Sequence, residues 1–291
     1  MTNPRVAPAA LRLPAPVPGP MQLKVGRLTR TYRVHRPQAV EDRPPLVVVL
    51  HGGFGSGEQA ERAYHWNDQA DAAGFVVCHP DGLMRAWNAG TCCGEPMRRG
   101  IDDVTYLAAL LDRLGAEEAV DPDRVYVTGI SNGAMMAYRL AAELPGRLAA
   151  IGPVAGTMCV RVPDERRALS ICHVHGLEDH SVPFHGGRGS RALSQDWRRA
   201  VPEVIAEWRR VTRCGPAEVS DQGPVRIETA TGTSGSEVAL VTIRGAGHQW
   251  PGSAPPPARV LRSLRMDPPS QAVDATTLLW AFFAAHPRAD A

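Results

Sequence analysis

The sequence Gly-Ile-Ser-Asn-Gly at residues 129–133 places Ser131 between two glycines, at the junction of an apolar run and a helical pattern. The apolar run, residues 124–128, is typical of a buried strand, and residues 134–140 are typical of a helix. The flanking glycines allow a sharp strand-to-helix turn and a close approach of the helix to neighbouring strands. A G-x-S-x-G string occurs by chance in many proteins, but this setting predicts a serine presented at the tip of a turn.

Continuous apolar runs alternate with helical patterns along the rest of the chain. Such runs are typical of strands buried on both faces of a parallel sheet. Their alternation with helices predicts an α/β protein with a mostly parallel central sheet flanked by helices. We expect strands at residues 23–34, 45–50, 75–78, 124–128, 148–154, 169–175, 225–230 and 238–243. We expect helices at residues 57–73, 104–111, 134–140, 201–213 and 275–285, the last of them amphipathic.

No internal repeat or strong linker divides the chain, so we expect a single domain over residues 22–288. A flexible leader rich in Pro and Ala is expected at residues 1–21, and it lacks the continuous apolar core of a signal peptide. The cytoplasm is therefore the default location. A formal net charge of +2 and the lack of a long apolar run argue against nucleic acid and membranes as partners.

Two further loops carry an acid and a histidine, each directly after a predicted strand. Glu178 and Asp179 follow the strand at 169–175, and His248 follows the strand at 238–243. The carboxyl ends of strands in an open α/β sheet gather the ligand and catalytic groups. The order serine, acid, histidine is that of the α/β-hydrolase triad. We predict that His248 takes the Ser131 proton and that the acid holds the imidazole.

The oxyanion that develops during attack on a carbonyl needs two preorganised donors, each worth about 3 kcal/mol. We expect one from the backbone N–H of Asn132, directly after the nucleophile. The other is expected from the loop at residues 51–54, at Gly53. The same glycine-rich loop lacks the Lys-Ser/Thr that a phosphate-binding loop requires.

Several other side chains near this site have more than one interpretation. Trp87 and Trp250 lie beside the predicted site, where they pack in the core or line an apolar acyl pocket. Four histidines lie near Asp179 in the sequence: His173, His175, His180 and His185. Their irregular spacing and the single nearby acid favour core or supporting roles over a metal site. We therefore expect no metal and no other cofactor.

The six cysteines fall into two groups. Cys78 and Cys172 lie in predicted strands, where we expect buried free thiols. The others lie in loops or at a helix end: Cys92, Cys93, Cys159 and Cys214. Disulfides form at such places if the protein meets an oxidising compartment. The sequence does not choose among the pairings.

A set of short motifs matches one family in order along the chain. The motifs are His51-Gly52-Gly53, Trp87-Asn88-Ala89-Gly90, Cys92-Cys93-Gly94, Asp102-Asp103-Val104, the serine turn with Met135-Met136, His175-Gly176 with Asp179 and Val182-Pro183, Gly247-His248 with Trp250-Pro251, and Trp280 with Phe282-Phe283. Over roughly residues 23–287, the chain resembles the polyhydroxybutyrate depolymerase and feruloyl esterase-like branch of the α/β-hydrolases. The resemblance implies the α/β-hydrolase fold and a triad of Ser131, Asp179 and His248.

The family's H-G-x-x-D pattern selects Asp179 over Glu178. The Cys92-Cys93 pair also follows the family pattern, and Cys214 is the partner that we consider for it. Many members of the family are secreted, so an extracellular location stays open. Residues 254–269, rich in Pro and Arg, either pack against the body or act as a lid.

The resemblance implies a serine esterase that works through an acyl-enzyme, on hydroxybutyrate or other hydroxyalkanoate oligomers. Small soluble esters are included, because only a short tail follows residue 287, with no substrate-binding module. A feruloyl or acetyl esterase acting on plant polysaccharide esters is the close alternative. A serine peptidase and a non-catalytic binding protein are distant alternatives, and the complete triad argues against the second.

Overall fold

The computed structural model describes residues 19–163, 169–191, 196–264 and 266–288. Within these residues the strands form one sheet of ten, in the order β1-β2-β4-β3-β5-β6-β7-β10-β9-β8. The strands are β1 (Met21–Val25), β2 (Leu28–His35), β3 (Leu46–Leu50), β4 (Val76–Pro80), β5 (Val125–Ile130), β6 (Ala150–Val154), β7 (Ser170–Gly176), β8 (Glu218–Gln222), β9 (Val225–Thr231) and β10 (Glu237–Ile243). The expected leader lies almost wholly outside the described residues, and its last residue, Met21, begins β1.

The six central strands, from β4 to β10, run parallel to one another. Antiparallel strands complete both edges: β2 and β1 beyond β4, and β9 and β8 beyond β10. This arrangement confirms the predicted α/β-hydrolase fold with a mostly parallel sheet. The edge strand β8 was not predicted, because all of its side chains are exposed and its sequence has no apolar run.

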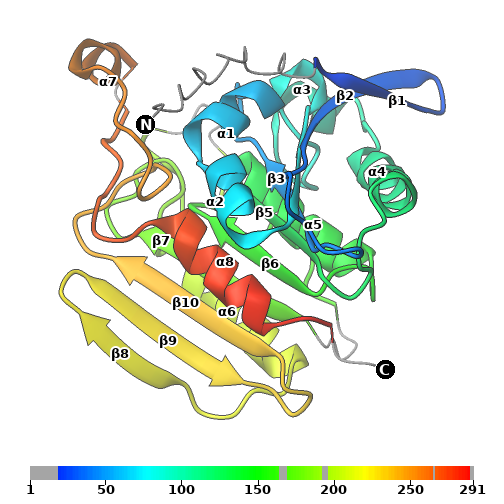
Figure 1. The fold of residues 1–291 in the computed structure, drawn as a ribbon. Helices are drawn as coiled ribbons and strands as arrows, with labels where there is room; N and C mark the ends of the chain where they lie inside the picture. The colour runs from blue at the N-terminus through cyan, green and yellow to red at the C-terminus, as the bar shows by residue number, and fades with distance from the viewer. Residues whose placement is uncertain (1–18, 164–168, 192–195, 265, 289–291) are drawn as a thin grey trace, which may run out of the picture.

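Helices cover both faces of the sheet (Figure 1). One face is packed by α4 (Asp103–Glu117), α5 (Asn132–Glu143) and α6 (Val201–Val211), and the other by α1 (Gly57–Ala63), α2 (Trp66–Ala73) and α8 (Ala275–Ala285). Alternate residues of β3 point to opposite sides, so Val48 joins the first core and Val49 the second. A continuous apolar strand such as β3 therefore contributes side chains to the cores on both faces of the sheet.

The helix predicted at residues 57–73 is two helices, α1 and α2. Ser56 caps α1 by accepting a hydrogen bond from the Gln59 N–H at 3.1 Å. His65 then takes a left-handed conformation with φ of 56°, which breaks the helix before Trp66. The break lets Tyr64 stack on Trp250, with ring centroids 4.5 Å apart.

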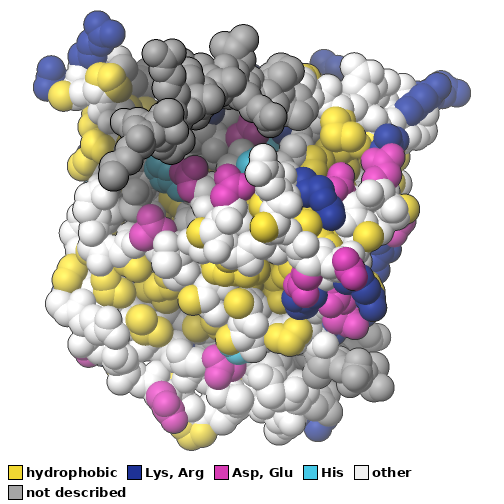
Figure 2. Space-filling model, viewed as in Figure 1, with side chains coloured by type: hydrophobic (Ala, Val, Ile, Leu, Met, Phe, Trp, Pro, Cys, Tyr) yellow, Lys and Arg dark blue, Asp and Glu magenta, His cyan; other side chains and the backbone are white. Residues whose placement is uncertain are grey.

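Smaller elements complete the described chain: the 3-10 turn η1 (Leu83–Arg85), α3 (Gly94–Arg98) and α7 (Ala258–Leu264). α7 lies within the segment considered as a lid and stands at the margin of the fold, away from the sheet (Figure 1). Basic side chains mark this corner in the space-filling view, whereas hydrophobic side chains gather across the face around α8 (Figure 2). No helix among the described residues has both the length and the apolar content that a bilayer span requires.

The cysteine pairing considered from the resemblance is wrong. The structure pairs Cys92 with its chain neighbour Cys93, and Cys214 is free. Cys214 follows α6, and its backbone forms an isolated antiparallel β-bridge with Gly232. The sulfur of Cys93, in contrast, lies 3.9 Å from the sulfur of Met135 on α5. Because Cys92 and Cys93 pair with each other, neither is left to pair with Cys214. Cys78 and Cys172 are buried free thiols, as expected, and burial raises the pKa of both.

Candidate active site

Ser131 occupies the turn between β5 and α5. Its backbone has φ of 56° and ψ of −119°, a conformation that side-chain-bearing residues rarely adopt and that costs about 1–3 kcal/mol. Two backbone hydrogen bonds hold it: Ser131 N–H donates to Val154 O at 2.9 Å, and Met135 N–H donates to Ser131 O at 3.0 Å. The fold therefore maintains a strained serine at the carboxyl end of a central strand.

The glycines on both sides of Ser131 are required by close backbone contacts. A Cβ on Gly129 would lie 2.6 Å from Leu50 O. A Cβ on Gly133 would overlap Leu50 O and lie 2.6 Å from His51 O. The turn thus packs directly on the end of β3, from which the loop of residues 51–54 emerges.

Asp179 and His248 meet on loops that follow two neighbouring parallel strands, β7 and β10. Asp179 Oδ2 lies 2.7 Å from His248 Nδ1. The other carboxylate oxygen, Oδ1, accepts hydrogen bonds from the N–H groups of Ser181 at 2.8 Å and Val182 at 2.7 Å. The carboxylate is fully buried, so its position is set by these donors rather than by solvent.

The contact between Asp179 and His248 shifts both pKa values. Burial raises the pKa of Asp179, but the charge and hydrogen bond of His248 outweigh this and hold it below its usual value. Burial lowers the pKa of His248, but the Asp179 carboxylate, with a smaller contribution from Asp267, raises it above its usual value. His248 is therefore a stronger base than a free imidazole, held with Nδ1 toward the acid.

Asp267 was missed by the sequence reasoning. Its Oδ2 accepts a hydrogen bond from the His248 backbone N–H at 3.0 Å, and its Oδ1 lies 2.5 Å from Arg191 Nη1. Arg191 N–H in turn donates to His180 O at 3.0 Å. Asp267 thus connects the histidine loop to the loop of the acid, and no motif marks it, since it is an isolated aspartate in a Pro-rich segment.

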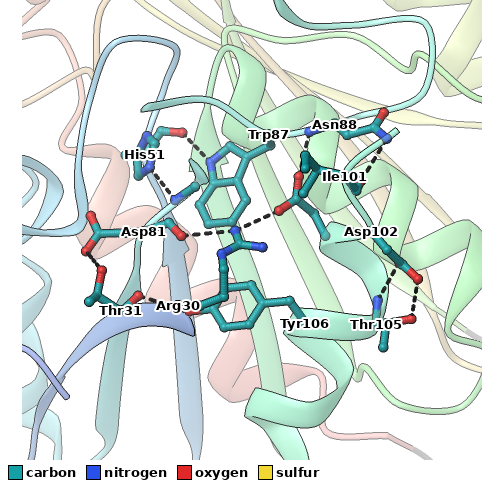
Figure 3. A network of polar contacts seen from close by, with 12 residues as sticks. Arg30, Thr31, His51, Asp81, Trp87, Asn88, Ile101, Asp102, Thr105 and Tyr106 are labelled. Carbon is teal, nitrogen blue, oxygen red and sulfur yellow. Dashed lines mark hydrogen bonds and ion pairs between the residues drawn. The ribbon is translucent and has the colours of Figure 1, made fainter. Parts of the chain in front are cut away.

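The loop after β3 is fixed by His51. Its Nε2 accepts a hydrogen bond from Gly82 N–H at 2.9 Å, so the proton is on Nδ1, which donates to Gly52 O at 2.7 Å. Burial lowers the pKa of His51, which keeps the ring neutral. Trp87 Nε1–H donates to His51 O at 2.9 Å, and Figure 3 shows the two rings side by side. Gly53 follows this anchored residue.

Asn132 clamps a second loop onto the serine turn. Its side-chain Oδ1 accepts from Trp87 N–H at 2.7 Å, and its Nδ2–H donates to Trp87 O at 3.0 Å. Its own backbone N–H is the first of α5, so it points out of the helix end, where the helix dipole favours negative charge.

A buried ion pair supports the Trp87 loop from below (Figure 3). Arg30 Nη2 lies 2.7 Å from Asp103 Oδ1, and both side chains are almost fully buried. Asp103 Oδ2 accepts a hydrogen bond from Asn88 N–H at 2.7 Å, and the Arg30 guanidinium stacks 4.0 Å from the centre of the Tyr106 ring.

The structure brings Ser131, Asp179 and His248 to the same edge of the sheet, each on a loop after a parallel strand. Trp87 and Trp250 are fully buried, and the Trp250 indole donates to Thr276 Oγ1 at 3.1 Å. In this structure both indoles contact protein groups in the core. The substrate-lining role expected for them remains a prediction.

Phe54, next to Gly53, is an exposed apolar residue that the sequence analysis did not consider. It is 66% exposed and has φ of 64°, and its N–H donates to Arg85 O at 2.7 Å. Met84, on the same neighbouring turn, is also exposed. The sequence shows that apolar residues lie near the His51-Gly52-Gly53 motif. Only the structure shows that their side chains are exposed.

Comparisons with known proteins match the chain to esterases. The family model described as "Esterase PHB depolymerase" matches residues 31–183. The chain is 33% identical over 259 residues to "Putative esterase NocK" of Nocardia uniformis subsp. tsuyamanensis, covering 81% of this chain and 74% of that protein. It is 29% identical over 162 residues to "Bifunctional acetylxylan esterase/xylanase XynS20E" of Neocallimastix patriciarum, covering 55% of this chain and 23% of that protein.

A solved structure supports the fold. "Acetyl xylan esterase from Aspergillus awamori" superposes with a TM-score of 0.60 at 16% sequence identity, covering 86% of this chain and all of that one. At this identity the likeness concerns the fold alone.

Proposed function

The chain belongs to the esterase PHB depolymerase family, and on that premise we propose that it is a serine carboxylic-ester hydrolase that works through an acyl-enzyme. The observation that carries the proposal is the 2.7 Å contact between Asp179 and His248, on the edge of the sheet where Ser131 is held in a strained turn. A buried acid that orients a basic imidazole is the arrangement by which a serine hydroxyl is activated.

The proposed reaction proceeds in two steps. His248 Nε2 takes the proton of Ser131 Oγ as the oxygen attacks the ester carbonyl, and then gives that proton to the departing alcohol. Water attacks the resulting acyl-serine with His248 as base again, which releases the acid and restores the hydroxyl. Asp179 stays ionised throughout, because its lowered pKa favours the carboxylate.

We propose that the oxyanion is held by the backbone N–H groups of Asn132 and Gly53. The first opens α5, and the second follows the His51 ring that Gly82 and Trp87 anchor. The hydrogen bonds that anchor His51 and the helical start of Asn132 support this proposal, because preorganised donors are the condition for transition-state stabilisation of this kind.

For the substrate, we propose hydroxyalkanoate oligomers and small esters, in line with the description of the matching family. Phe54 and Met84 are the apolar side chains that stand exposed next to the proposed oxyanion loop. Acetyl esters of polysaccharides are the second candidate, because the name of one relative includes acetylxylan esterase. Feruloyl esters remain the related alternative.

Replacement of Ser131 by alanine tests the proposed nucleophile. Purified protein is expected to hydrolyse p-nitrophenyl butyrate, and Ser131→Ala is expected to lower kcat by about 10⁴-fold or more. The melting temperature is expected to stay the same, because alanine keeps the Cβ and therefore the same backbone strain. The measurement is release of nitrophenol, with circular dichroism as the control for folding. Full activity in Ser131→Ala would rule out the assignment.

A comparison of substrates separates the candidates. Initial rates on hydroxybutyrate trimers, acetylated xylan and methyl ferulate are measured with the same enzyme preparation. A preference for the trimers supports the proposed substrate, and a preference for either of the others replaces it.

A further inference from the structure

A line of buried polar side chains leads from α5 through β7 to the loop of Asp179. Tyr138 Oη lies 2.8 Å from His173 Nδ1, and His173 Nε2 lies 3.0 Å from His175 Nδ1. His175 Nε2 lies 2.9 Å from Val182 O. All three side chains are at most 1% exposed, and the two imidazole rings are nearly parallel, with centroids 5.3 Å apart.

The protons along this line can be assigned from its end. Val182 O can only accept a hydrogen bond, so His175 carries its proton on Nε2 and its Nδ1 accepts. His173 must then donate from Nε2 and accept at Nδ1, which leaves the Tyr138 hydroxyl as the donor. Burial lowers the pKa of both histidines, so the rings stay neutral and this one arrangement is kept.

The line of polar side chains ends at Val182, which also donates a hydrogen bond to Asp179. Val182 O receives the His175 proton, while Val182 N–H donates to Asp179 Oδ1 at 2.7 Å. His175 Nε2 also lies 3.5 Å from Asp179 Oδ2, the oxygen that contacts His248. The His175 N–H therefore faces both the backbone of the turn and the carboxylate that the turn presents.

Packing alone does not explain three polar groups at this place. Burying a hydroxyl and two imidazoles costs more free energy than burying apolar side chains of similar size, unless every donor and acceptor is paired. Here the pairing is complete from the Tyr138 hydroxyl to Val182 O. A phenylalanine in each position would fill the space but could not donate to the turn.

We propose that His175 is a positioning residue of the triad: its N–H holds the turn that presents Asp179, and Tyr138 and His173 fix the tautomer that supplies this N–H. The inference rests on the triad proposed above. It assigns to His175 a role in catalysis through Asp179, without contact with the substrate.

The expected consequence of losing the His175 N–H is a change in the pKa of His248. Among the described residues, the titratable groups that act on His248 or are acted on by it are Asp179, Asp267 and His175. Without the His175 N–H, the turn loosens, Asp179 aligns less well with His248 Nδ1, and the pKa of His248 falls. The acidic limb of kcat/KM, where His248 must lose its proton, then moves to lower pH. A loss of core packing alone would not move this limb.

The test uses His175→Phe, which keeps the ring volume and removes the donor. The expected result is a fall in kcat of about 10- to 100-fold, with KM little changed, because a small displacement of a catalytic group costs this much. The acidic limb shifts downward, and the His248 titration followed by NMR shows the same shift. His175→Gln, whose amide N–H can reach Val182 O, is expected to restore most of kcat.

The matched control is His79→Phe. His79 is another fully buried histidine, on β4, with Nε2 3.0 Å from Asn67 Oδ1, and its replacement is expected to lower the melting temperature without moving the pH limb. An unchanged or raised His248 pKa in His175→Phe overturns the inference, as does a failure of His175→Gln to restore kcat. The Ser131→Ala variant separates the two proposals: if it stays active, the proposed function fails, whereas the NMR titration still decides the role of His175.

Discussion

At the scale of single residues, the chemistry of this site depends on charges that face His248. Asp179 contacts Nδ1 directly, and Asp267 holds the backbone of the same residue from the other side. Both carboxylates favour the protonated imidazole, and together they outweigh the burial that disfavours it. Arg191 pairs with Asp267 at a partly exposed position, so it reduces the negative field that reaches His248.

Two substitutions of this ion pair are expected to move the pH dependence in opposite directions. In the proposed mechanism, activity requires neutral His248 and is therefore lost as pH falls through its raised pKa. Asp267→Asn removes a charge but keeps an acceptor for the His248 N–H, so the pKa falls and the acidic limb of kcat/KM moves to lower pH. Arg191→Met leaves Asp267 unpaired, so the limb moves to higher pH.

The measurement is a pH profile of kcat/KM at low ionic strength, since salt screens partly exposed charges. Both shifts should shrink when the salt concentration is raised to about 1 M, where the screening length is about 3 Å. Shifts of the same sign in the two variants would contradict the account of Asp267.

At the scale of elements, the serine turn is determined by how closely α5 approaches β3. Gly133 has no room for a Cβ beside Leu50 O and His51 O. Such a contact links the proposed nucleophile to the proposed oxyanion loop, because the backbones of Gly133 and residues 50–51 meet there. The strain at Ser131 is sustained by this packing and by the hydrogen bonds to Val154 and Met135.

A pair of glycine substitutions separates this packing from helix propensity. Gly133→Ala is expected to lower the free energy of unfolding by about 1–3 kcal/mol, because backbone atoms must move apart, and to lower kcat strongly. Gly115→Ala, at an exposed position within α4 with open space around the Cβ, is expected to raise the free energy of unfolding by about 0.5–1 kcal/mol. Urea denaturation of the two variants measures both effects. A Gly133→Ala enzyme with wild-type stability would contradict the close contact.

At the scale of the whole molecule, distant segments converge beneath the site. Arg30 on the edge strand β2 pairs with Asp103 at the start of α4, and Asp103 holds Asn88. Trp87, next to Asn88, is held by Asn132 at the start of α5. The antiparallel edge of the sheet is thereby connected to the first turn of α5, directly after Ser131.

Loss of the buried charge on Asp103 is expected to destabilise the entire fold. Asp103→Asn leaves the Arg30 guanidinium buried without a counter-charge, which costs about 3–5 kcal/mol. The matched control is Asp102→Asn, the same chemical change at the exposed N-cap of α4, where asparagine caps as well as aspartate. Thermal and urea denaturation measure the difference. Equal stability of the two variants would mean that the buried pair contributes nothing.

Much of the fold could be predicted from local patterns. The apolar runs predicted every central parallel strand, and their alternation with helices predicted the fold class. The polar edge strand β8 and the break at His65 could not be predicted, because neither follows a hydrophobic period. Asp267 was missed for a related reason, whereas supporting roles were expected for His173 and His175 without the contacts that define them. Asp267 lies in a Pro-rich segment, and the roles of His173 and His175 depend on contacts with Tyr138 and Val182.

The sequence alone determined which groups stand at the carboxyl ends of which strands, because strand periodicity and the order Ser131, Asp179, His248 are properties of the chain itself. Only the tertiary structure decided that β7 and β10 are neighbours and that Trp87 and Trp250 are buried. It also decided the 2.7 Å contact between Asp179 and His248. The reason is physical: pKa values, tautomers and burial are set by what lies across the fold, and those neighbours are tens of residues away in the chain.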